Sequence, residues 1–384
     1  MVEISEREEE LPEAVIGKLL KIAAEDKSIA SLGPGEPDFS LPKPLVNYIP
    51  QLKNKVNHYS PPAGRSDLRE AIAKKVRKEN KIKALPENVV VTAGSQEALM
   101  LASMCTLDVS DQVILPTPAF MGYQPMFDLI NAQVVPIQLK EELKFELSPD
   151  DLKKHIDKKK TKVLLINSPS NPTGNVIRKK VLEEISDIAV ENDLYIFSDE
   201  AYEKIVYDQK HYSIGSFNGM EQRVVTLQSF SKSHAMCGFR IGYAIANPEL
   251  VQAISKIHIY STLTACTLSQ MLAVKALKLS EKYINAMVKS YRIRRDYLVT
   301  RLNELDLPTP KPEGAFYTFS NISEYSNNSF KFASDLLKAK VAVVPGIEFG
   351  LYGEGYIRCS YATNLNVIKT AAERLEKFLK KYGK

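Results

Sequence analysis

The stretch RVVTLQSFSKSHAMCGFRIGYAIA (residues 223–246) places two apolar runs, 224–228 and 241–246, on either side of a polar segment. Continuous apolar runs of this kind indicate strands that are covered on both faces. The polar segment holds Lys232 and, eight residues later, Arg240. Taken alone, Lys232 is most simply an exposed residue at the rim of a strand. A lysine in a dry site instead loses proton affinity and becomes a nucleophile for carbonyl groups.

Similar apolar runs recur along the first two thirds of the chain. Helix patterns separate several of them, such as 66–80, where Leu68, Ile72 and Val76 stand four residues apart, and 181–191. This alternation predicts an α/β fold in which helices cover a mostly parallel seven-stranded sheet. The seven expected strands are 88–92, 112–116, 132–139, 162–167, 194–198, 224–228 and 241–246.

The pattern changes after about residue 250 and predicts a smaller α+β domain. A long helix over 280–305 and a final helix over 366–381 enclose three short strands there, over 314–319, 341–346 and 356–362. The segment before residue 45 is rich in proline and shows no strand partner of its own, so we expect it to pack on the small domain. The expected units are an N-terminal segment, 1–45, a large domain, 46–280, and a small domain, 281–384.

The composition excludes several classes of protein. The 384 residues carry a net charge of +5, with basic and acidic residues interspersed, which argues against a nucleic-acid surface. The acidic N-terminus is no secretory signal, and no apolar run is long enough to cross a bilayer. We expect a cytoplasmic protein without a metal, a nucleic-acid partner or a membrane contact. The cysteines are scattered, without metal-ligand or redox-pair spacing: Cys105, Cys237, Cys266 and Cys359.

The turns after the expected strands carry the informative polar residues, because ligands of open α/β sheets bind at the carboxyl ends of strands. Gly94, Ser95 and Gln96 open a helix after the first strand, where free N–H groups suit a phosphate. Taken alone, these residues are better explained by an ordinary strand-to-helix turn capped by a serine. Asn171 lies in the sequence Asn-Pro-Thr-Gly, which by itself is turn chemistry. Asp199 follows a buried strand and is either a helix cap or a carboxylate held at a site.

Together these residues describe one chemistry. The functional groups of pyridoxal phosphate (PLP) are matched by a phosphate-binding turn, a carboxylate, the phenol of Tyr202, an amide, a lysine and an arginine. A buried carboxylate such as Asp199 keeps the ring nitrogen protonated, so that the ring withdraws electrons. Each of the four motifs has an ordinary structural explanation when it is taken alone. It is improbable that all four explanations hold together, in this order along a parallel α/β pattern.

The chain resembles the class I/II aminotransferases, which are fold-type I PLP enzymes. The resemblance runs from SLGPGEPDF (31–39) to IRCSYAT (357–363), and it is closest to archaeal broad-specificity aspartate and aromatic aminotransferases. The other motifs that carry it are HYSPPAGRSDLREAIA, NSPSNPTG, SDEAYE, SFSKSHAMCGFRIGY, GAFY and VAVVPG.

The resemblance implies roles for the residues at the expected site. Lys232 matches the Schiff-base lysine, which also moves the proton, and Asp199 matches the partner of the pyridinium nitrogen. Asn171 and Tyr202 match the pair that binds the 3′ oxygen of the cofactor. Lys232, Asp199 and Tyr202 are therefore the expected catalytic residues. The expected phosphate ligands are Ser95, Ser229 and Arg240, with the backbone at Gly94 and Gln96.

Further matches concern the ring, the substrate and a second subunit. Phe120 falls where an aromatic side chain stacks on the cofactor. Gly35 and Arg358 match the residues that hold the α-carboxylate of the substrate, beside Phe120 and Asn171. An arginine suits this task because its fork binds both carboxylate oxygens. Tyr59 matches a tyrosine that reaches the phosphate of the neighbouring subunit, which implies a homodimer with shared active sites.

The implied reaction moves the amino group of an L-amino acid to a 2-oxo acid, with 2-oxoglutarate as the expected acceptor, by a ping-pong mechanism. Ser95 stands where some acid-specific members carry a lysine, which favours a broad or aromatic range over strict aspartate specificity. Tyr123 and Tyr260 either line the side-chain pocket or pack in the core. Cys237 replaces the usual Thr or Pro, and we expect little effect.

Three alternatives remain at this point. A carbon–sulfur lyase or a decarboxylase of the same fold would share the cofactor residues. A transcription regulator with this fold would need a DNA-binding domain, for which the match beginning near residue 31 leaves no room. A nicotinamide oxidoreductase would need a glycine-rich turn between a strand and a helix, and GPGEPDF is not in such a place.

Overall fold

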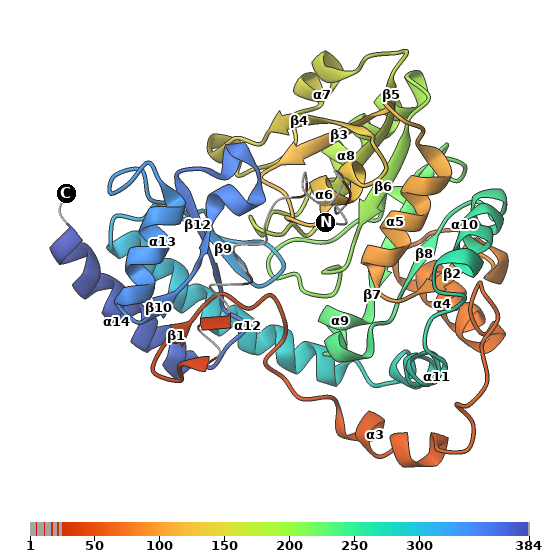
Figure 1. The fold of residues 1–384 in the computed structure, drawn as a ribbon, viewed down its shortest axis with the longest axis horizontal. Coiled ribbons are helices and arrows are strands. Elements are labelled where there is room, and N and C mark those ends of the chain that lie inside the picture. Colours follow the sequence, from red (N-terminus) through yellow and green to blue (C-terminus); the bar gives the residue numbers. More distant parts are fainter. Residues whose placement is uncertain (1–4, 6–10, 12–16, 18–20, 23–24, 383–384) are drawn as a thin grey trace.

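The computed structural model describes residues 5, 11, 17, 21–22 and 25–382. A seven-stranded sheet forms the centre of the larger part of the molecule (Figure 1). Its strands are parallel to their neighbours except β8, which runs antiparallel to both β2 and β7. In spatial order the strands are β2 (Val89–Thr92), β8 (Gly242–Ile245), β7 (Val224–Ser229), β6 (Tyr195–Asp199), β5 (Thr161–Asn167), β3 (Gln112–Thr117) and β4 (Gln133–Gln138). The predicted mostly parallel sheet is confirmed, and each expected strand lies within two residues of its observed bounds.

Helices cover both faces of this sheet and make three layers. On one face, α5 (Ser95–Thr106), α6 (Tyr123–Asp128) and α10 (Pro248–Ser261) pack on the sheet in one apolar cluster. On the other face, two clusters complete the core. The first cluster contains α4 (Ser66–Glu79) and α11 (Thr267–Ala276). The second contains α7 (Pro149–His155) and α8 (Lys179–Glu191).

The local sequence explains where these helices form. In α4 the stripe of Leu68, Ile72 and Val76 is fully buried, and burial of such a side chain contributes about 1.5–3 kcal/mol. Helix α7 begins at the N-cap Ser148, whose hydroxyl accepts a hydrogen bond from the backbone of Asp151. Proline follows that cap, acidic residues occupy the first turn and basic residues the last, as the helix dipole favours.

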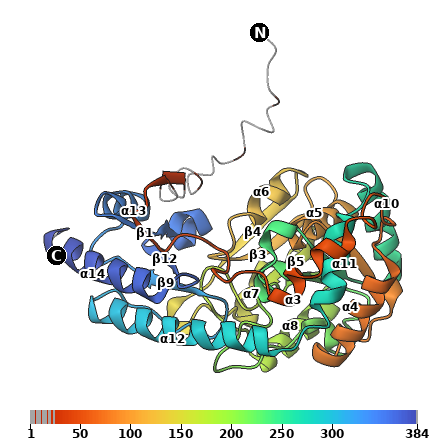
Figure 2. The same cartoon turned by 90° about the horizontal axis from the view of Figure 1, so that it is seen from below.

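The smaller part of the molecule is built on a three-stranded antiparallel sheet in the order β11 (Val344–Pro345), β12 (Tyr356–Ser360) and β9 (Tyr317–Asn321). Helices α13 (Ser329–Lys338) and α14 (Leu365–Tyr382) pack against this part. Helix α12 (Lys282–Glu304) lies beside α14 and runs towards α9 (Phe230–Ser233) and α11, so it joins the two parts (Figures 1 and 2).

Two details of the small part differ from the expectations. The strand expected over 314–319 begins only at Tyr317, because Ala315 has a left-handed backbone with φ of 55° and Gly314 instead forms a bridge to Val206. The strand expected over 341–346 is split. Its first half, β10 (Val341–Ala342), and its second half, β11, belong to different sheets.

The expectation that the N-terminal segment lacks a strand partner was wrong. Strand β1 (Ala30–Ser31) pairs in parallel with β10 (Figure 1). Two residues are too few to show a strand periodicity in the sequence. We propose, as expected, that the units are 1–45, 46–280 and 281–384. Residues 1–4, 6–10, 12–16, 18–20 and 23–24 of the first unit lie outside the described residues.

The remaining elements are short connections. One is α3 (Lys43–Val46). The 3-10 segments are η1 (Ile49–Leu52), η2 (Pro86–Asn88), η3 (Glu141–Leu143), η4 (Ile214–Ser216), η5 (Cys237–Phe239), η6 (Gly346–Phe349) and η7 (Leu351–Gly353).

Candidate active site

The carboxyl ends of three neighbouring parallel strands bring polar residues to one edge of the large sheet. Asn167 ends β5, Asp199 ends β6 and Ser229 ends β7, and Asn167 is in register with Asp199. Asn167 Nδ2 donates to the carbonyl oxygen of Asp199 at 3.0 Å, which ties the two strand ends together. The site therefore lies where an open α/β sheet places its ligands.

Asp199 is a buried carboxylate held by two hydrogen bonds. Its Oδ2 accepts the hydroxyl of Tyr123 at 2.8 Å, and its Oδ1 accepts the backbone N–H of Ala201 at 3.0 Å. Burial raises the pKa of Asp199, and burial together with the Asp199 charge raises the pKa of Tyr123 well above its usual value. The phenol is therefore a stable donor. A positively charged partner of Asp199 would relieve the cost of its burial.

Tyr123 was left open between a side-chain pocket and the core; its ring is buried in the apolar cluster of α5, α6 and α10, and its hydroxyl also donates to Asp199. This contact makes it a candidate site residue that the sequence did not assign. The signal was its place in PTPAFMGY, after the end of β3, beside the expected stacking residue Phe120. The ring of Phe120 meets Tyr123 edge-on, with 5.3 Å between the ring centroids.

Arg358 is a buried cation on β12 that reaches the sheet edge. Its Nη1 donates to Asn171 Oδ1 at 3.1 Å and its Nη2 donates to the carbonyl oxygen of Gly33 at 2.7 Å. Its Nε is buried without a hydrogen-bond partner, and no carboxylate pairs with this guanidinium among the described residues. Burial lowers the pKa of Arg358. A buried arginine without an acid partner fits an anionic ligand.

Lys232 reaches the same place from α9. Its Nζ donates to the carbonyl oxygen of Gly35 at 2.6 Å and lies 5.9 Å from the centroid of the Tyr202 ring. The Tyr202 hydroxyl is 2.8 Å from the hydroxyl of Tyr317. The loop of residues 33–35 thus receives hydrogen bonds from both Lys232 and Arg358, so the structure brings these two expected residues together.

The turn before α5 has the features of a phosphate cradle. Gly94 has φ of 91° and caps α5 without a side-chain hydrogen bond, so N–H groups of the first helical turn remain available. A Cβ atom on Gly94 would lie 2.9 Å from Arg240 Nη2. The backbone N of Ser95 would lie 2.7 Å from a Cβ atom on Gly242, so only glycine allows this approach. The cradle therefore joins Gly94, Ser95 and Arg240.

Other expected residues lie less clearly at the site. Ser229 Oγ caps α9 by accepting the N–H of Ser231 at 3.1 Å. Gln96 is exposed in the first turn of α5. Tyr59 and Tyr260 are each 84% exposed, so neither packs in the core of this chain. Tyr59 has no hydrogen bond within the described part of the chain. The structure therefore does not bring Tyr59 together with the other expected site residues.

The residues at this edge fit PLP. The cradle at Gly94 takes an anion, Asp199 is a buried acid that a protonated ring nitrogen would neutralise, and Lys232 offers an amine. When bound, PLP supplies a ring that withdraws electrons from the α-carbon of an amino acid. Asn167, Gly33 and Tyr317 also belong to the site, and sequence reasoning missed them as individual residues although all three lie in the motifs quoted above.

Comparisons with known proteins agree with this geometry. Residues 27–375 match the family model for aminotransferase class I and II. The chain belongs to the class I and II aminotransferases. It is 44% identical over 95% of both chains to an aspartate aminotransferase of Pyrococcus abyssi. It is 41% identical over 98% of both to aromatic-amino-acid aminotransferase 2 of Thermococcus litoralis.

The solved structures lead to the same family. The aromatic aminotransferase of Pyrococcus horikoshii matches with a TM-score of 0.90 and 42% identity, over 95% of this chain and 99% of that one. The aminotransferase described here is therefore a PLP-dependent amino-acid transaminase of fold type I, as the sequence predicted. None of the helices in the part of the chain that the structure describes has the length and apolar character of a membrane crossing.

Proposed function

We propose that this aminotransferase acts on a broad range of L-amino acids that includes aromatic ones and aspartate. The second substrate in the proposal is a 2-oxo acid, 2-oxoglutarate in the first place. The relatives support this range, because one is named for aspartate and another for aromatic amino acids. Ser95 supports it further, since a lysine at this place would favour a second carboxylate.

The observation that carries the proposal is the buried guanidinium of Arg358, which faces Asn171 and lacks an acid partner among the described residues. Every amino-acid and 2-oxo-acid substrate has a carboxylate beside the reacting carbon. A planar fork binds both oxygens of this group and so orients the α-carbon. Gly35 shares the loop that Arg358 contacts, and in the proposal its backbone completes the carboxylate site.

The remaining roles in the proposal are those that the family resemblance implies. Lys232 Nζ holds the aldehyde end of the cofactor and moves the proton at the α-carbon. Asp199 keeps the ring nitrogen protonated, and Asn171 and Tyr202 hold the 3′ oxygen. The phosphate is held by Ser95, Ser229 and Arg240 with the backbone at Gly94 and Gln96. Phe120 stacks on the ring and, with Asn171, borders the substrate.

A homodimer with shared active sites is part of the proposal, and so is the cytoplasm as its location. Tyr59 supports the dimer because its ring is 84% exposed and lacks a hydrogen bond within the described residues. Tyr260 is exposed to the same extent. Exposed aromatic side chains are enriched at subunit interfaces. Analytical ultracentrifugation of the wild type and of Tyr59→Phe, with PLP titrations of both, tests this point.

A substrate screen tests the function directly. The purified protein is incubated with PLP, 2-oxoglutarate and, in turn, aspartate, tyrosine, phenylalanine, kynurenine and alanine, and glutamate formation is measured. We expect glutamate from aspartate and from at least one aromatic donor. Glutamate from aspartate alone would contradict the broad range. Elimination or decarboxylation products without glutamate would instead favour a lyase or a decarboxylase.

A further inference from the structure

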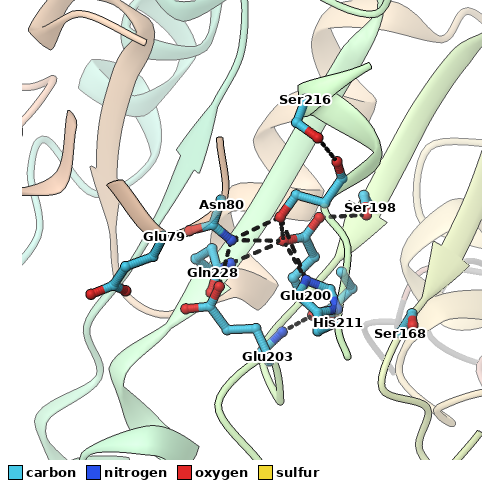
Figure 3. A network of polar contacts seen from close by, with 12 residues as sticks. Glu79, Asn80, Ser168, Ser198, Glu200, Glu203, His211, Ser216 and Gln228 are labelled. Carbon is cyan, nitrogen blue, oxygen red and sulfur yellow. Dashed lines mark hydrogen bonds and ion pairs between the residues drawn. The ribbon is translucent and has the colours of Figure 1, made fainter. Parts of the chain in front are cut away.

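A buried polar network surrounds Glu200 (Figure 3). Glu200 directly follows Asp199, the last residue of β6. Its carboxylate is 0% exposed. Five side chains place hydrogen-bonding groups 2.6–3.4 Å from its two oxygens. They are Ser198 Oγ on Oε1, and Asn80 Nδ2, His211 Nε2, Ser213 Oγ and Gln228 Nε2 on Oε2.

These partners come from four different segments of the large part. Ser198 belongs to β6, Gln228 to β7, Asn80 caps α4, and the other two stand before η4. The backbone N–H of Glu200 also donates to the carbonyl oxygen of Leu227 at 2.9 Å. The main chain at 199–200 is therefore anchored by the Glu200 side chain and by the backbone hydrogen bond to Leu227.

A metal centre is the first alternative for such a cluster. Glu200, Glu203 and His211 offer ligand atoms within 4.8 Å of one another. However, Glu203 already pairs with Lys75 and accepts the Asn80 amide, and four groups surround Glu200 Oε2. The ammonium group at Glu203 supplies the positive charge that a metal ion would bring. The network is therefore organised around protein donors.

Stability alone is a poor explanation for Glu200. A buried charge costs free energy even when it is hydrogen-bonded, and apolar residues of similar volume are often as stable in its place. Its position is more informative, because within the described residues the Asp199 carboxylate is held only by Tyr123 and by the N–H of Ala201. The direction of that carboxylate depends on the main chain that Glu200 anchors.

We propose that Glu200 is a positioning residue for the cofactor. It fixes the end of β6 so that the Asp199 carboxylate stands in line with the ring nitrogen of PLP, and His211, Ser213 and Gln228 hold Glu200 in turn. Supporting residues behind a directly binding group commonly change affinity about 10- to 100-fold when they are removed.

The test compares Glu200→Ala and Glu200→Gln with the wild type. Three quantities are measured: the PLP dissociation constant of the apoprotein, the pH midpoint of the visible absorption band of the holoenzyme, and the Tm of the apoprotein. We expect Glu200→Ala to weaken PLP binding about tenfold or more and to shift the midpoint. Glu200→Gln should restore most of both, because its amide oxygen can accept from Ser213 and Gln228 while its NH₂ donates to Ser198.

Glu141→Ala is the matched control. Its carboxylate accepts hydrogen bonds from Asn321 Nδ2 and the Tyr356 hydroxyl, each at 2.9 Å, where η3 meets the small sheet. This variant should lower the Tm and leave PLP binding and the midpoint unchanged. If Glu200→Ala also lowers the Tm without changing PLP binding or the midpoint, the proposal is overturned, and Glu200 has a structural role alone. A loss of PLP affinity after dialysis of the wild type against EDTA would overturn it in favour of a metal centre.

Ser213→Ala keeps the proposal testable if Glu200→Ala does not fold. It removes the shortest of these hydrogen bonds, 2.6 Å to Glu200 Oε2, with little change of volume. We expect PLP binding to weaken about threefold, because Ser213 acts on the cofactor through Glu200, with a loss of Tm from the missing hydrogen bond. Unchanged PLP affinity in this variant would overturn the proposal.

Discussion

Arg358 Nη1 donates a 3.1 Å hydrogen bond to Asn171 Oδ1 and so joins strand β12 of the small sheet to the loop after β5 of the large one. The two residues are 187 positions apart in the sequence. The bond holds the guanidinium at the edge of the large sheet. At this edge Asn167 donates to the carbonyl oxygen of Asp199 and accepts the backbone N–H of Asn171. The proposed sites of the substrate carboxylate and of the cofactor ring are therefore joined by one continuous set of contacts.

Arg358→Lys should impair substrate binding and spare the cofactor. A lysine keeps the charge but loses the fork that binds both carboxylate oxygens. We expect kcat/KM to fall about a hundredfold or more, mainly through KM, with an unchanged PLP dissociation constant. Steady-state kinetics with aspartate and a PLP titration check this.

The control for this prediction is Arg301→Lys in the same part of the molecule. Arg301 forms partly exposed ion pairs with Glu304 and Glu376, away from the site residues, so the same change of side chain should leave kcat/KM within about twofold. A loss of PLP affinity in Arg358→Lys that equals its loss of kcat/KM would show that Arg358 acts on the cofactor, against the proposed role.

Lys232→Ala should abolish transamination and still bind PLP. The cradle at Gly94 and the carboxylate of Asp199 remain, while the amine that moves the proton is lost. We expect kcat to fall about a thousandfold or more, since a positioned acid or base contributes about 10²–10⁴-fold and the covalent link is lost as well. Borohydride reduction of the wild type followed by peptide mapping should find the cofactor on Lys232. The exposed Lys153→Ala variant should match the wild type, and label on any other lysine would refute the assignment.

The predictable part of the fold and of the site was local in sequence. Continuous apolar runs such as that of β7 show a doubly covered strand, and the residues after each run stand at the site edge because parallel strands end together. Asp199 and Lys232 could be found in this way.

The contacts between distant residues could not be predicted. The bond from Tyr123 to Asp199 spans 76 positions, and nothing near Tyr123 in the sequence specifies its partner. The partners of Glu200 also come from four segments of the chain. Strand β1 has two residues and the left-handed conformation concerns the single residue Ala315. Both are too short to show as a periodicity of apolar residues in the sequence.

Gly94→Ala should weaken the binding of PLP through its phosphate. The new methyl group would lie 2.9 Å from Arg240 Nη2, and the backbone has φ of 91°, which L-residues rarely adopt. We expect the PLP dissociation constant to rise about tenfold, equal to about 1.4 kcal/mol. Absorbance titration of the apoprotein with PLP measures it.

Gly355→Ala is the matched control for backbone strain. Its φ is 83°, and a Cβ atom there meets nothing within 4 Å. Both variants should lose some Tm through strain, and only Gly94→Ala should lose PLP affinity. Equal PLP affinity in the two variants would contradict the phosphate cradle at Gly94.

The last prediction concerns acid stability and Glu203. Burial alone would raise the pKa of this carboxyl, but the charges of Lys75, His211 and Lys204 outweigh it and lower the pKa from 4.5 to about 2. A carboxyl with a lowered pKa stabilises the folded state above its unfolded pKa, and the contribution is lost as the pH falls through the folded value. The stabilisation by Glu203 should therefore be complete above about pH 5 and disappear towards about pH 2. Glu203→Gln should have a lower apoprotein Tm than the wild type near neutral pH, with a difference that shrinks on acidification, whereas the exposed Glu191→Gln should follow the wild type throughout. A Tm difference that stays constant from about pH 7 to about pH 2.5 would show that Glu203 contributes through shape and hydrogen bonding instead of charge.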